Sequence, residues 1–324
     1  MAKKTMVGID QDSGAVRGAR LSYDEAKGGK GGASGWKLLS FEEVADDLSD
    51  AVKLSAALKK LKDKLGVSAT DVVSTCLSGK QTYAAQLEVK KLPDSEMAGM
   101  LKLELRKSMP FEASAATFDF AFLPVEPNRP RDAGVQVIVS AVSNALLSKH
   151  LLAYERAGMK PNNVNVLPVS AANAFWASRK PNATADVNET HVLLHVGSDT
   201  CTLVIDGSRS PFFTRSFSFG ASDVLGGKGD AEATSQSALQ LNVLSSELTK
   251  SVAYYKNTYA NQGVGNISTI TVIGNDASNP LFETLGAKTG YTIQTIETAR
   301  TIQSAKQPEA GKYDLAIAVA MQAA

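Results

Sequence analysis

The sequence predicts an α/β protein built from two related lobes that face each other across a cleft. Three observations carry this prediction. The 324 residues are enough for about two domains with substantial cores. Strand-like apolar runs alternate with amphipathic helical stretches. A hairpin pattern occurs at residues 6–17 and again at residues 193–205, and each copy consists of an apolar strand, a small polar turn and a second apolar strand.

The first hairpin carries side chains that suit a phosphate group and a metal ion. Asp10 ends its first strand, Ser13 and Gly14 lie in the turn, and Arg17 follows three residues later. Backbone N–H groups and a hydroxyl bind phosphate oxygens, a carboxylate holds the shell of Mg²⁺, and a cation balances the charge. An ordinary hairpin with a polar turn has the same pattern, so both interpretations stay open at this point.

The composition is that of a globular protein and excludes some classes of partner. Hydrophobic residues make up 44% of the chain, and 34 basic residues balance 33 acidic ones. Because there is no basic excess, no nucleic-acid partner is expected. No apolar run is long enough to span a membrane, and Asp10 and Asp12 arrive before a signal peptide could form. A membrane role is therefore expected only through a partner.

The two cysteines indicate the cellular compartment. Cys76 and Cys201 lie far apart, each within an apolar strand-like run. They are expected to be buried free thiols, which suits a reducing cytoplasm.

The first lobe is expected to continue with one helix and one returning strand. The glycine-rich run at residues 28–35 is predicted to be a flexible hairpin tip. From Asp47 to Leu65, leucines recur near helical spacing and Gly66 follows, which predicts an amphipathic helix with a C-cap glycine. Residues 71–78 are predicted to form a short strand.

From Lys80 the chain changes to a separate α/β unit. A helix is predicted between the N-cap signal at residues 93–96 and Pro110, because the residue before a proline is disfavoured in the helical conformation. Strands are predicted at residues 82–89, around the alternating Phe118, Phe120 and Phe122, and at residues 135–142.

The chain then returns to the first lobe. A helix is predicted from Asn144 to Ala157 before Gly158, and a second helix opens at Pro168 after a short extended segment at residues 164–166. The polar stretch at residues 180–189 is predicted to link the two lobes.

The second lobe is expected to begin with the repeated hairpin. Its helical stretches are predicted at residues 239–259, near Pro280 and at residues 313–321, with a loose loop at residues 226–235. Its further strands are predicted at residues 211–218, 267–273 and 291–296, and a turn at residues 274–278.

Five segments follow one another in a recognisable order. They are RKSMPFE at 106–112, ERAGMKP at 155–161, FTR at 213–215 leading to Gly220, ELTKS at 247–251, and YDLAIAVA at 313–320. Together they resemble the actin-like ATPase superfamily, and within it the family of the type IV pilus assembly protein PilM, which is similar in fold to the division protein FtsA. The resemblance covers nearly the whole chain.

The resemblance implies an actin-like ATPase fold, with two lobes around a nucleotide cleft and an inserted FtsA-type middle subdomain. The first lobe would comprise residues 1–79 and 155–188, the middle subdomain residues 80–154, and the second lobe residues 189–324. The implied cofactors are ATP and Mg²⁺, with Asp10 as the magnesium ligand. The implied nucleotide-binding positions are Asp10, Gln11, Asp12, Ser13, Gly14, Arg17, Gly197, Ser198, Asp199, Thr200, Gly220, Glu247, Lys250, Gly274 and Asn275.

Three nucleotide motifs depart from the family pattern. Asp12 stands where the family has glycine, and a second carboxylate repels a triphosphate. His195 stands where an aspartate is usual, which removes an oxygen ligand that Mg²⁺ prefers. Asn275 and Asp276 follow Gly274 where further glycines are usual, and their side chains take up space that a nucleotide needs. Weak or absent ATP hydrolysis is therefore expected.

The resemblance also implies a cytoplasmic scaffold at the base of the pilus, on the inner face of the inner membrane. This scaffold would capture the N-terminal tail of a PilN-like inner-membrane protein and connect to the pilus motor ATPases. Arg106, Lys107 and Phe111 of the middle subdomain are the candidate contacts for the tail. Self-association, as in the filaments of FtsA, is left open.

Two other functions remain as alternatives. One is an active ATP-dependent switch, in which Asp10, Ser13, Arg17 and Glu247 would hold Mg-ATP. The other is a small-molecule kinase of the same superfamily, which needs a catalytic carboxylate facing an acceptor, and Asp199 is the candidate.

Overall fold

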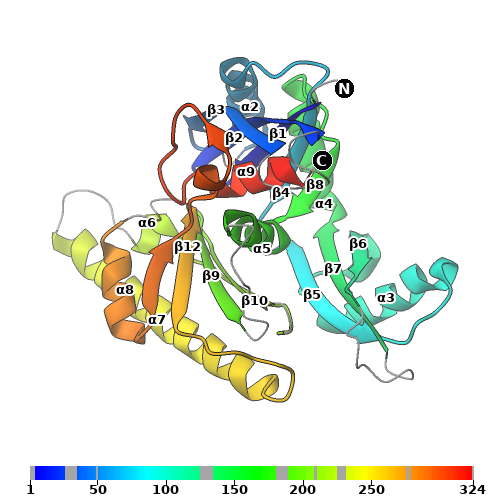
Figure 1. Ribbon diagram of the computed structural model, residues 1–324, viewed down its shortest axis with the longest axis vertical. Coiled ribbons are helices and arrows are strands. Elements are labelled where there is room, and N and C mark those ends of the chain that lie inside the picture. Colours follow the sequence, from blue (N-terminus) through cyan, green and yellow to red (C-terminus); the bar gives the residue numbers. More distant parts are fainter. Residues whose placement is uncertain are drawn as a thin grey trace.

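The computed structural model describes residues 4–25, 35–48, 50–124, 134–179, 189–207, 210–224, 231–274, 277 and 279–322. Within these residues the chain forms three β-sheets, which Figure 1 shows at the top, the lower left and the lower right. Their strand orders are β14-β3-β2-β1-β4-β8, β11-β10-β9-β12-β13 and β5-β7-β6. The predicted α/β fold class is confirmed.

The first sheet is covered by helices on both faces. Val7 and Ile9 of β1 pack against α2 (Ala51–Leu65) and α4 (Asn144–Arg156), while Met6 of the same strand packs against α9 (Asp314–Met321). This follows from the alternation of side chains along a strand. The strands are β1 (Lys4–Gln11), β2 (Ala15–Tyr23), β3 (Trp36–Ala45), β4 (Val72–Leu77), β8 (Asn163–Val166) and β14 (Gln303–Ser304).

The second sheet shares a core with the first. Helices α7 (Ala231–Thr258) and α8 (Leu281–Thr289) cover one face, and α5 (Leu167–Ser178) and α9 cover the other. Helices α5 and α9 lie side by side between the two sheets (Figure 1). The remaining elements are β9 (Thr190–Val196), β10 (Cys201–Gly207), β11 (Phe213–Phe217), α6 (Ala221–Val224), β12 (Thr269–Gly274), β13 (Thr292–Thr295) and the 3₁₀ turn η3 (Thr298–Thr301).

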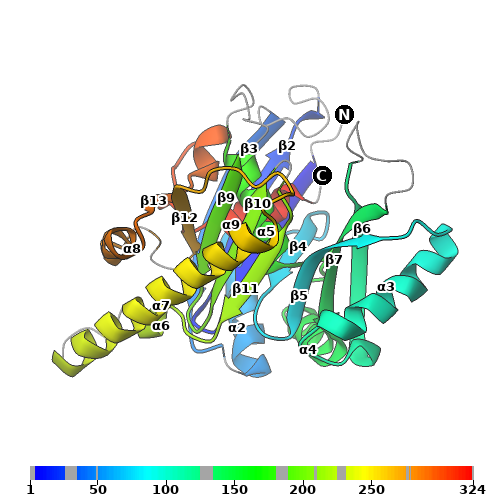
Figure 2. The same cartoon turned by 90° about the horizontal axis from the view of Figure 1, so that it is seen from below.

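The third sheet and helix α3 (Asp94–Ser108) form a unit beside the other two (Figure 2). Met97, Leu101 and Leu105 are buried against the sheet, as their helical spacing predicts. Phe118 and Phe120 also pack there, whereas Phe122 is 46% exposed. The sheet consists of β5 (Thr82–Val89), β6 (Ala116–Phe122) and β7 (Val135–Ser143), with the 3₁₀ turn η2 (Ala113–Ala115) before β6.

Several element boundaries differ from the predictions. Helix α2 begins at Ala51 rather than near Asp47, because Asp50 caps it by accepting two backbone N–H groups. Helix α3 has Pro93 at its N-cap and no side-chain cap. Helix α7 begins at Ala231, so part of the loop expected at residues 226–235 is helical. The predicted C-cap glycines Gly66 and Gly158 both have positive φ.

Other predicted segments fall partly or wholly outside the described residues. These are most of the glycine-rich tip at residues 28–35 and most of the linker at residues 180–189. The terminal segment was predicted to belong to the second lobe. In the structure its strand β14 joins the first sheet, and its helix α9 packs against that sheet. Both cysteines are buried and free, as expected. None of the described helices is long and apolar enough to cross a membrane.

The free energy of unfolding is expected to depend on pH because of a buried histidine in α4. The ring of His150 lies 4.6 Å from that of Tyr154 with a tilt of 42°, and neither ring nitrogen of His150 has a hydrogen-bond partner among the described residues. Burial lowers the pKa of His150 to about 4. In the unfolded chain the histidine binds a proton near pH 6.5, whereas in the folded protein it does so only near pH 4. The contribution of neutral His150 to the free energy of unfolding is therefore complete above pH 6.5 and is lost as the pH falls toward 4.

We therefore expect the wild-type protein to lose about 2 kcal/mol more stability than His150→Phe between pH 7 and about pH 5. Urea unfolding of both proteins at the two pH values measures the difference. Phenylalanine retains the ring contact with Tyr154 and cannot titrate. Equal losses in the two proteins would contradict the prediction.

Candidate functional site

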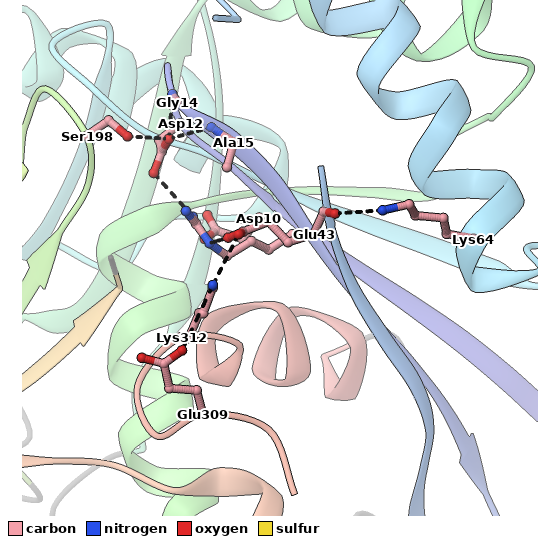
Figure 3. A network of polar contacts seen from close by, with 10 residues as sticks. Asp10, Asp12, Gly14, Ala15, Glu43, Lys64, Ser198, Glu309 and Lys312 are labelled. Carbon is pink, nitrogen blue, oxygen red and sulfur yellow. Dashed lines mark hydrogen bonds and ion pairs between the residues drawn. The ribbon is translucent and has the colours of Figure 1, made fainter. Parts of the chain in front are cut away.

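Three strands of the first sheet align a row of charged side chains (Figure 3). Arg17 on β2 lies opposite Asp10 on β1 and opposite Glu43 on β3, so the three side chains face one side of the sheet. The Arg17 Nη1 atom lies 3.7 Å from Asp10 Oδ2, and Arg17 Nε donates to Glu43 Oε2 at 2.7 Å. Lys312, which precedes α9, pairs with Glu43 at 3.1 Å. Arg17 is therefore held by carboxylates on both neighbouring strands.

The turn between β1 and β2 folds around the carboxylate of Asp12. Its Oδ1 atom accepts the backbone N–H groups of Gly14 at 2.8 Å and Ala15 at 3.0 Å. Its Oδ2 atom accepts from Arg17 Nη1 at 3.2 Å. Turn N–H groups and a guanidinium are donors that bind phosphate oxygens. In this turn they bind a carboxylate of the same chain.

The second hairpin turn contacts the first. Ser198, between β9 and β10, donates its hydroxyl to Asp12 Oδ1 at 2.8 Å. A Cβ atom at Gly14 would lie 2.5 Å from Ser198 Oγ, so the absence of a side chain at Gly14 permits this approach. The prediction that the two hairpin turns face each other is confirmed.

Gly220 supports the second turn through close backbone packing. A Cβ atom at Gly220 would lie 2.4 Å from the carbonyl oxygens of Gly197 and Ser198. The residues that follow Gly220 donate backbone N–H groups to the same two carbonyls at 2.8 and 3.0 Å. Within the turn, the Gly197 N–H donates to the Thr200 carbonyl at 2.9 Å, and Asp199 at the tip is exposed.

The first turn is also held by hydrogen bonds from the segment between β3 and α2. The carbonyls of Ser13 and Gly14 accept the N–H groups of Leu48 and Asp46, in the segment between β3 and α2, at 2.9 and 3.1 Å. Gln11 lies just before the turn, and its buried Oε1 atom has no hydrogen-bond partner in the described part of the chain. Each turn is therefore braced by a neighbouring segment of the chain.

Burial and the neighbouring charges set the protonation of this cluster. Burial raises the pKa of Asp10 to about 6, and Arg17 only partly opposes the rise. Burial also acts to raise the pKa of Asp12, but Arg17 and the hydrogen bonds from Ser198 and Gly14 outweigh it and hold the pKa below its ordinary value. Asp12 is therefore the more firmly ionised of the two carboxyl groups.

The donor set suits Mg²⁺ poorly. Asp10, the predicted ligand, is buried and faces the Arg17 cation. His195 is also buried, and burial lowers its pKa to about 4. The described part of the chain holds no group of three His, Cys, Asp or Glu side chains able to bind a metal ion. Mg²⁺ prefers several oxygen ligands around one position.

The third nucleotide motif reaches the second hairpin. Gly274 ends β12 with a φ of 105°, and a Cβ atom there would lie 2.4 Å from the Val196 carbonyl and 3.1 Å from His195 Nε2. Glycine is therefore required at this position by both its conformation and its surroundings. Asn275, which follows, lies outside the described residues.

The predicted positions on α7 lie in a different cluster. Glu247 accepts from Arg215 of β11 at 2.8 Å and from Lys250 at 3.3 Å. Among the described contacts, neither Glu247 nor Lys250 reaches Asp12 or Ser198. Their assignment to a nucleotide stays a prediction.

A groove of about 890 Å³ lies between the second and third sheets. Its walls include β5 and β11, which Figure 2 shows next to each other. Both are edge strands, since β5 pairs with β7 and β11 pairs with β10 in the described sheets. The backbone N–H of Phe212 donates to the Gln86 side chain at 2.7 Å and ties the two walls together.

The groove walls are rich in aromatic rings and carry positive charge. Tyr83, Phe213 and Tyr254 line the groove, and the rings of Phe213 and Tyr254 lie 5.9 Å apart. Lys80 and Arg215 also line it, and the described lining residues include no carboxylate. An extended segment with apolar side chains fits such walls.

The predicted peptide contacts lie beside this groove. Lys107 is on the exposed face of α3 and pairs with Glu104 at 2.9 Å, and Arg106 is exposed next to it. Phe111 is half-buried. The groove is lined instead by Ser108 and Pro110 from the same stretch. A role for Arg106, Lys107 and Phe111 in peptide binding stays a prediction.

A family model described as "Type IV pilus assembly protein PilM" matches residues 8–226. The chain belongs to this family. The match spans the third sheet, the repeated hairpin and the first sheet apart from β14 and the start of β1, so the PilM assignment covers both hairpin turns and the β5 wall of the groove. A role in type IV pilus assembly follows from the family.

One solved structure has the same fold, and two others align more weakly. A structure described as a PilM-PilN type IV pilus biogenesis complex aligns with a TM-score of 0.79 at 16% identity and covers 98% of each chain. A protein of actin-like ATPase fold from Bacteroides thetaiotaomicron aligns with a TM-score of 0.49 at 10% identity, over 92% of this chain and 95% of that one. The ethanolamine utilization protein EutJ from Carboxydothermus hydrogenoformans aligns with a TM-score of 0.49 at 13% identity, over 99% and 90%. No curated protein matches the sequence.

Some features of the candidate site carry no sequence signal. Glu43 and Lys312 join the Arg17 cluster from a strand and a loop that the motifs do not mark. The bond between Asp12 and Ser198 joins residues 186 positions apart. The groove exists because two edge strands from different sheets meet, and edge positions depend on the strand order.

Proposed function

We propose that this PilM-family protein is a cytoplasmic scaffold of the type IV pilus assembly platform. It binds the N-terminal cytoplasmic tail of a PilN-like inner-membrane protein, and this tail holds it at the inner face of the membrane. The observation that carries the proposal is the aromatic groove between β5 and β11. The similar solved structure is a PilM-PilN complex, which supports a partner of this class.

The groove explains how a short tail would bind. Edge strands present N–H and C=O groups that an added extended strand can pair with, and neighbouring side-chain pockets give specificity. The five residues of β11 span about 17 Å, which is enough to pair with roughly five residues of a tail. Tyr254 is 56% exposed and Phe213 lies beside it, so both offer apolar surface to the bound segment.

A second hollow, of about 810 Å³, lies near the start of β9 and suits a peptide less well. Its cationic side chains pair with carboxylates that line the same hollow, Arg179 with Glu189 at 2.7 Å and Arg300 with Glu297 at 2.6 Å. It is not walled by two edge strands. We therefore assign the tail to the groove between β5 and β11.

The test of this function is calorimetry with a synthetic peptide of the PilN-like tail. The protein should bind it with a dissociation constant in the micromolar range, and a scrambled peptide should not bind. Cooperative unfolding of the same preparation shows that the protein is folded. If such a preparation gives no binding heat with the native tail, the scaffold proposal is overturned. Connections to motor ATPases and self-association are further proposals that the same preparation can test.

The proposed scaffold does not depend on ATP. Arg17 is already paired with carboxylates, Asp12 fills the turn, and Mg²⁺ has a poor donor set there. We expect millimolar Mg-ATP to shift the thermal unfolding midpoint by less than about 1 °C. A ligand at one hundred times its dissociation constant would add about 2.7 kcal/mol, which moves the midpoint by several degrees. Such a shift would favour the ATP-dependent switch instead.

A further inference from the structure

We propose that the Asp12 carboxylate is a built-in anion, which occupies an anion-binding turn of the first hairpin and latches it to the second. The inference deepens the proposed function, since a scaffold that works without a nucleotide needs another means of holding its two hairpins together. It also predicts that removing the carboxylate creates a site for inorganic phosphate.

Four donors from the described residues converge on the two oxygens of Asp12. Two are backbone N–H groups, from Gly14 at 2.8 Å and Ala15 at 3.0 Å. The others are the guanidinium of Arg17 at 3.2 Å and the hydroxyl of Ser198 at 2.8 Å. Such a set of charged and neutral donors binds a tetrahedral oxyanion as well as a carboxylate. The Asp12 side chain is only 9% exposed, so the carboxylate occupies the position between these donors that a bound anion would take.

The charges around the turn exclude a second anion while Asp12 is present. Arg17 lies within 4 Å of three carboxylates, at 3.7 Å from Asp10, 3.2 Å from Asp12 and 2.7 Å from Glu43. Lys312 offsets part of the charge of Glu43. Without Asp12, two turn N–H groups and one guanidinium hydrogen would face an empty volume, and an anion would restore their hydrogen bonds.

The same carboxylate joins the two lobes. The first turn is fixed to its lobe by the N–H groups of Leu48 and Asp46, and the second is fixed by the residues after Gly220. The Asp12–Ser198 bond therefore connects two braced turns rather than two loose loops. Gly14 adds close contact with Ser198 on the same side.

The experiment compares the wild-type protein with Asp12→Gly and Asp12→Asn in thermal unfolding, with inorganic phosphate titrated against chloride at equal ionic strength. Phosphate should leave the wild-type midpoint unchanged. Asp12→Gly should unfold at a lower temperature without phosphate and recover by about 2 °C or more in millimolar phosphate. Asp12→Asn should not recover, because the amide still fills the turn.

Three results would overturn the built-in anion. One is equal stabilisation of the wild-type protein and Asp12→Gly by phosphate. Another is recovery of Asp12→Asn to the same extent as Asp12→Gly, which would mean that phosphate stabilises any variant that has lost this charge. The third is a folded Asp12→Gly that phosphate does not stabilise.

Ser198→Ala tests the latch in a variant that removes a single hydroxyl. Amide hydrogen exchange should become faster in both turns, while phosphate still leaves the unfolding midpoint unchanged. Unchanged exchange in the turns would refute the latch. Tail binding is measured on the same variants to separate this inference from the proposed function. If the phosphate experiment fails while the tail still binds, only the built-in anion and its latch are refuted.

Discussion

Replacing Tyr254 with aspartate is expected to weaken binding of the PilN-like tail at least 30-fold, or about 2 kcal/mol. Tyr254 lines the groove opposite β5 and contacts the ring of Phe213. An aspartate removes the aromatic surface and places a charge where the bound segment must exclude water. Because Tyr254 is 56% exposed in the free protein, the substitution should change folding stability little.

The matched control is Leu239→Asp on the same helix. Leu239 is 61% exposed and does not line the groove. Calorimetry with the tail peptide should give an unchanged dissociation constant for this variant. Equal weakening by both substitutions would indicate a general effect on α7 or on net charge, and it would count against the groove as the binding site.

Gly8→Ala is expected to destabilise the protein by about 3 kcal/mol or more. Gly8 on β1 faces α9, and a Cβ atom there would lie 2.0 Å from the Ala316 carbonyl oxygen and 2.4 Å from the Ala320 nitrogen. Both are backbone atoms, so no side-chain rotation can relieve the clash. Helix α9 packs against both main sheets, and its displacement would loosen the core that positions both hairpin turns.

Gly99→Ala provides the comparison, since it makes the same chemical change in helix α3, where no described atom beyond the adjacent residues and the nearby backbone of the helix lies within 4 Å of the added methyl group. This variant should be neutral or more stable by up to about 1 kcal/mol, because alanine favours a helix interior. Urea unfolding of both variants and the wild-type protein measures the contrast. A loss below about 1 kcal/mol in Gly8→Ala would show that α9 can shift freely.

Local patterns were sufficient for most of the secondary structure. The spacing of Met97, Leu101 and Leu105 predicts a buried helix face, and the glycines at positions 66 and 158 end their helices in left-handed conformations. The start of α7 was less predictable, because residues 231–238 have no strong apolar periodicity. Boundaries of this kind depend on weak local preferences that tertiary contacts easily change.

The candidate site was only partly predictable. Asp10, Asp12 and Arg17 could be selected because they lie within one short hairpin, and the pairing of its strands brings them together. The pattern could not show that the charge of Arg17 is neutralised by carboxylates, because one of these carboxylates is Glu43 from β3. Glu247 and Lys250 form a cluster with Arg215, a contact set by the packing of α7 against the second sheet.

The sequence by itself determined the repeated hairpins, the α/β class and the resemblance to the PilM family, because these depend on residues close together in the chain. Only the tertiary structure decided that Asp12 turns inward to bind its own turn and Ser198, and that β5 and β11 meet as edge strands. The physical reason is that a carboxylate takes its role from the donors around it. Those donors come from two lobes that are brought into contact by the shared packing of α5 and α9.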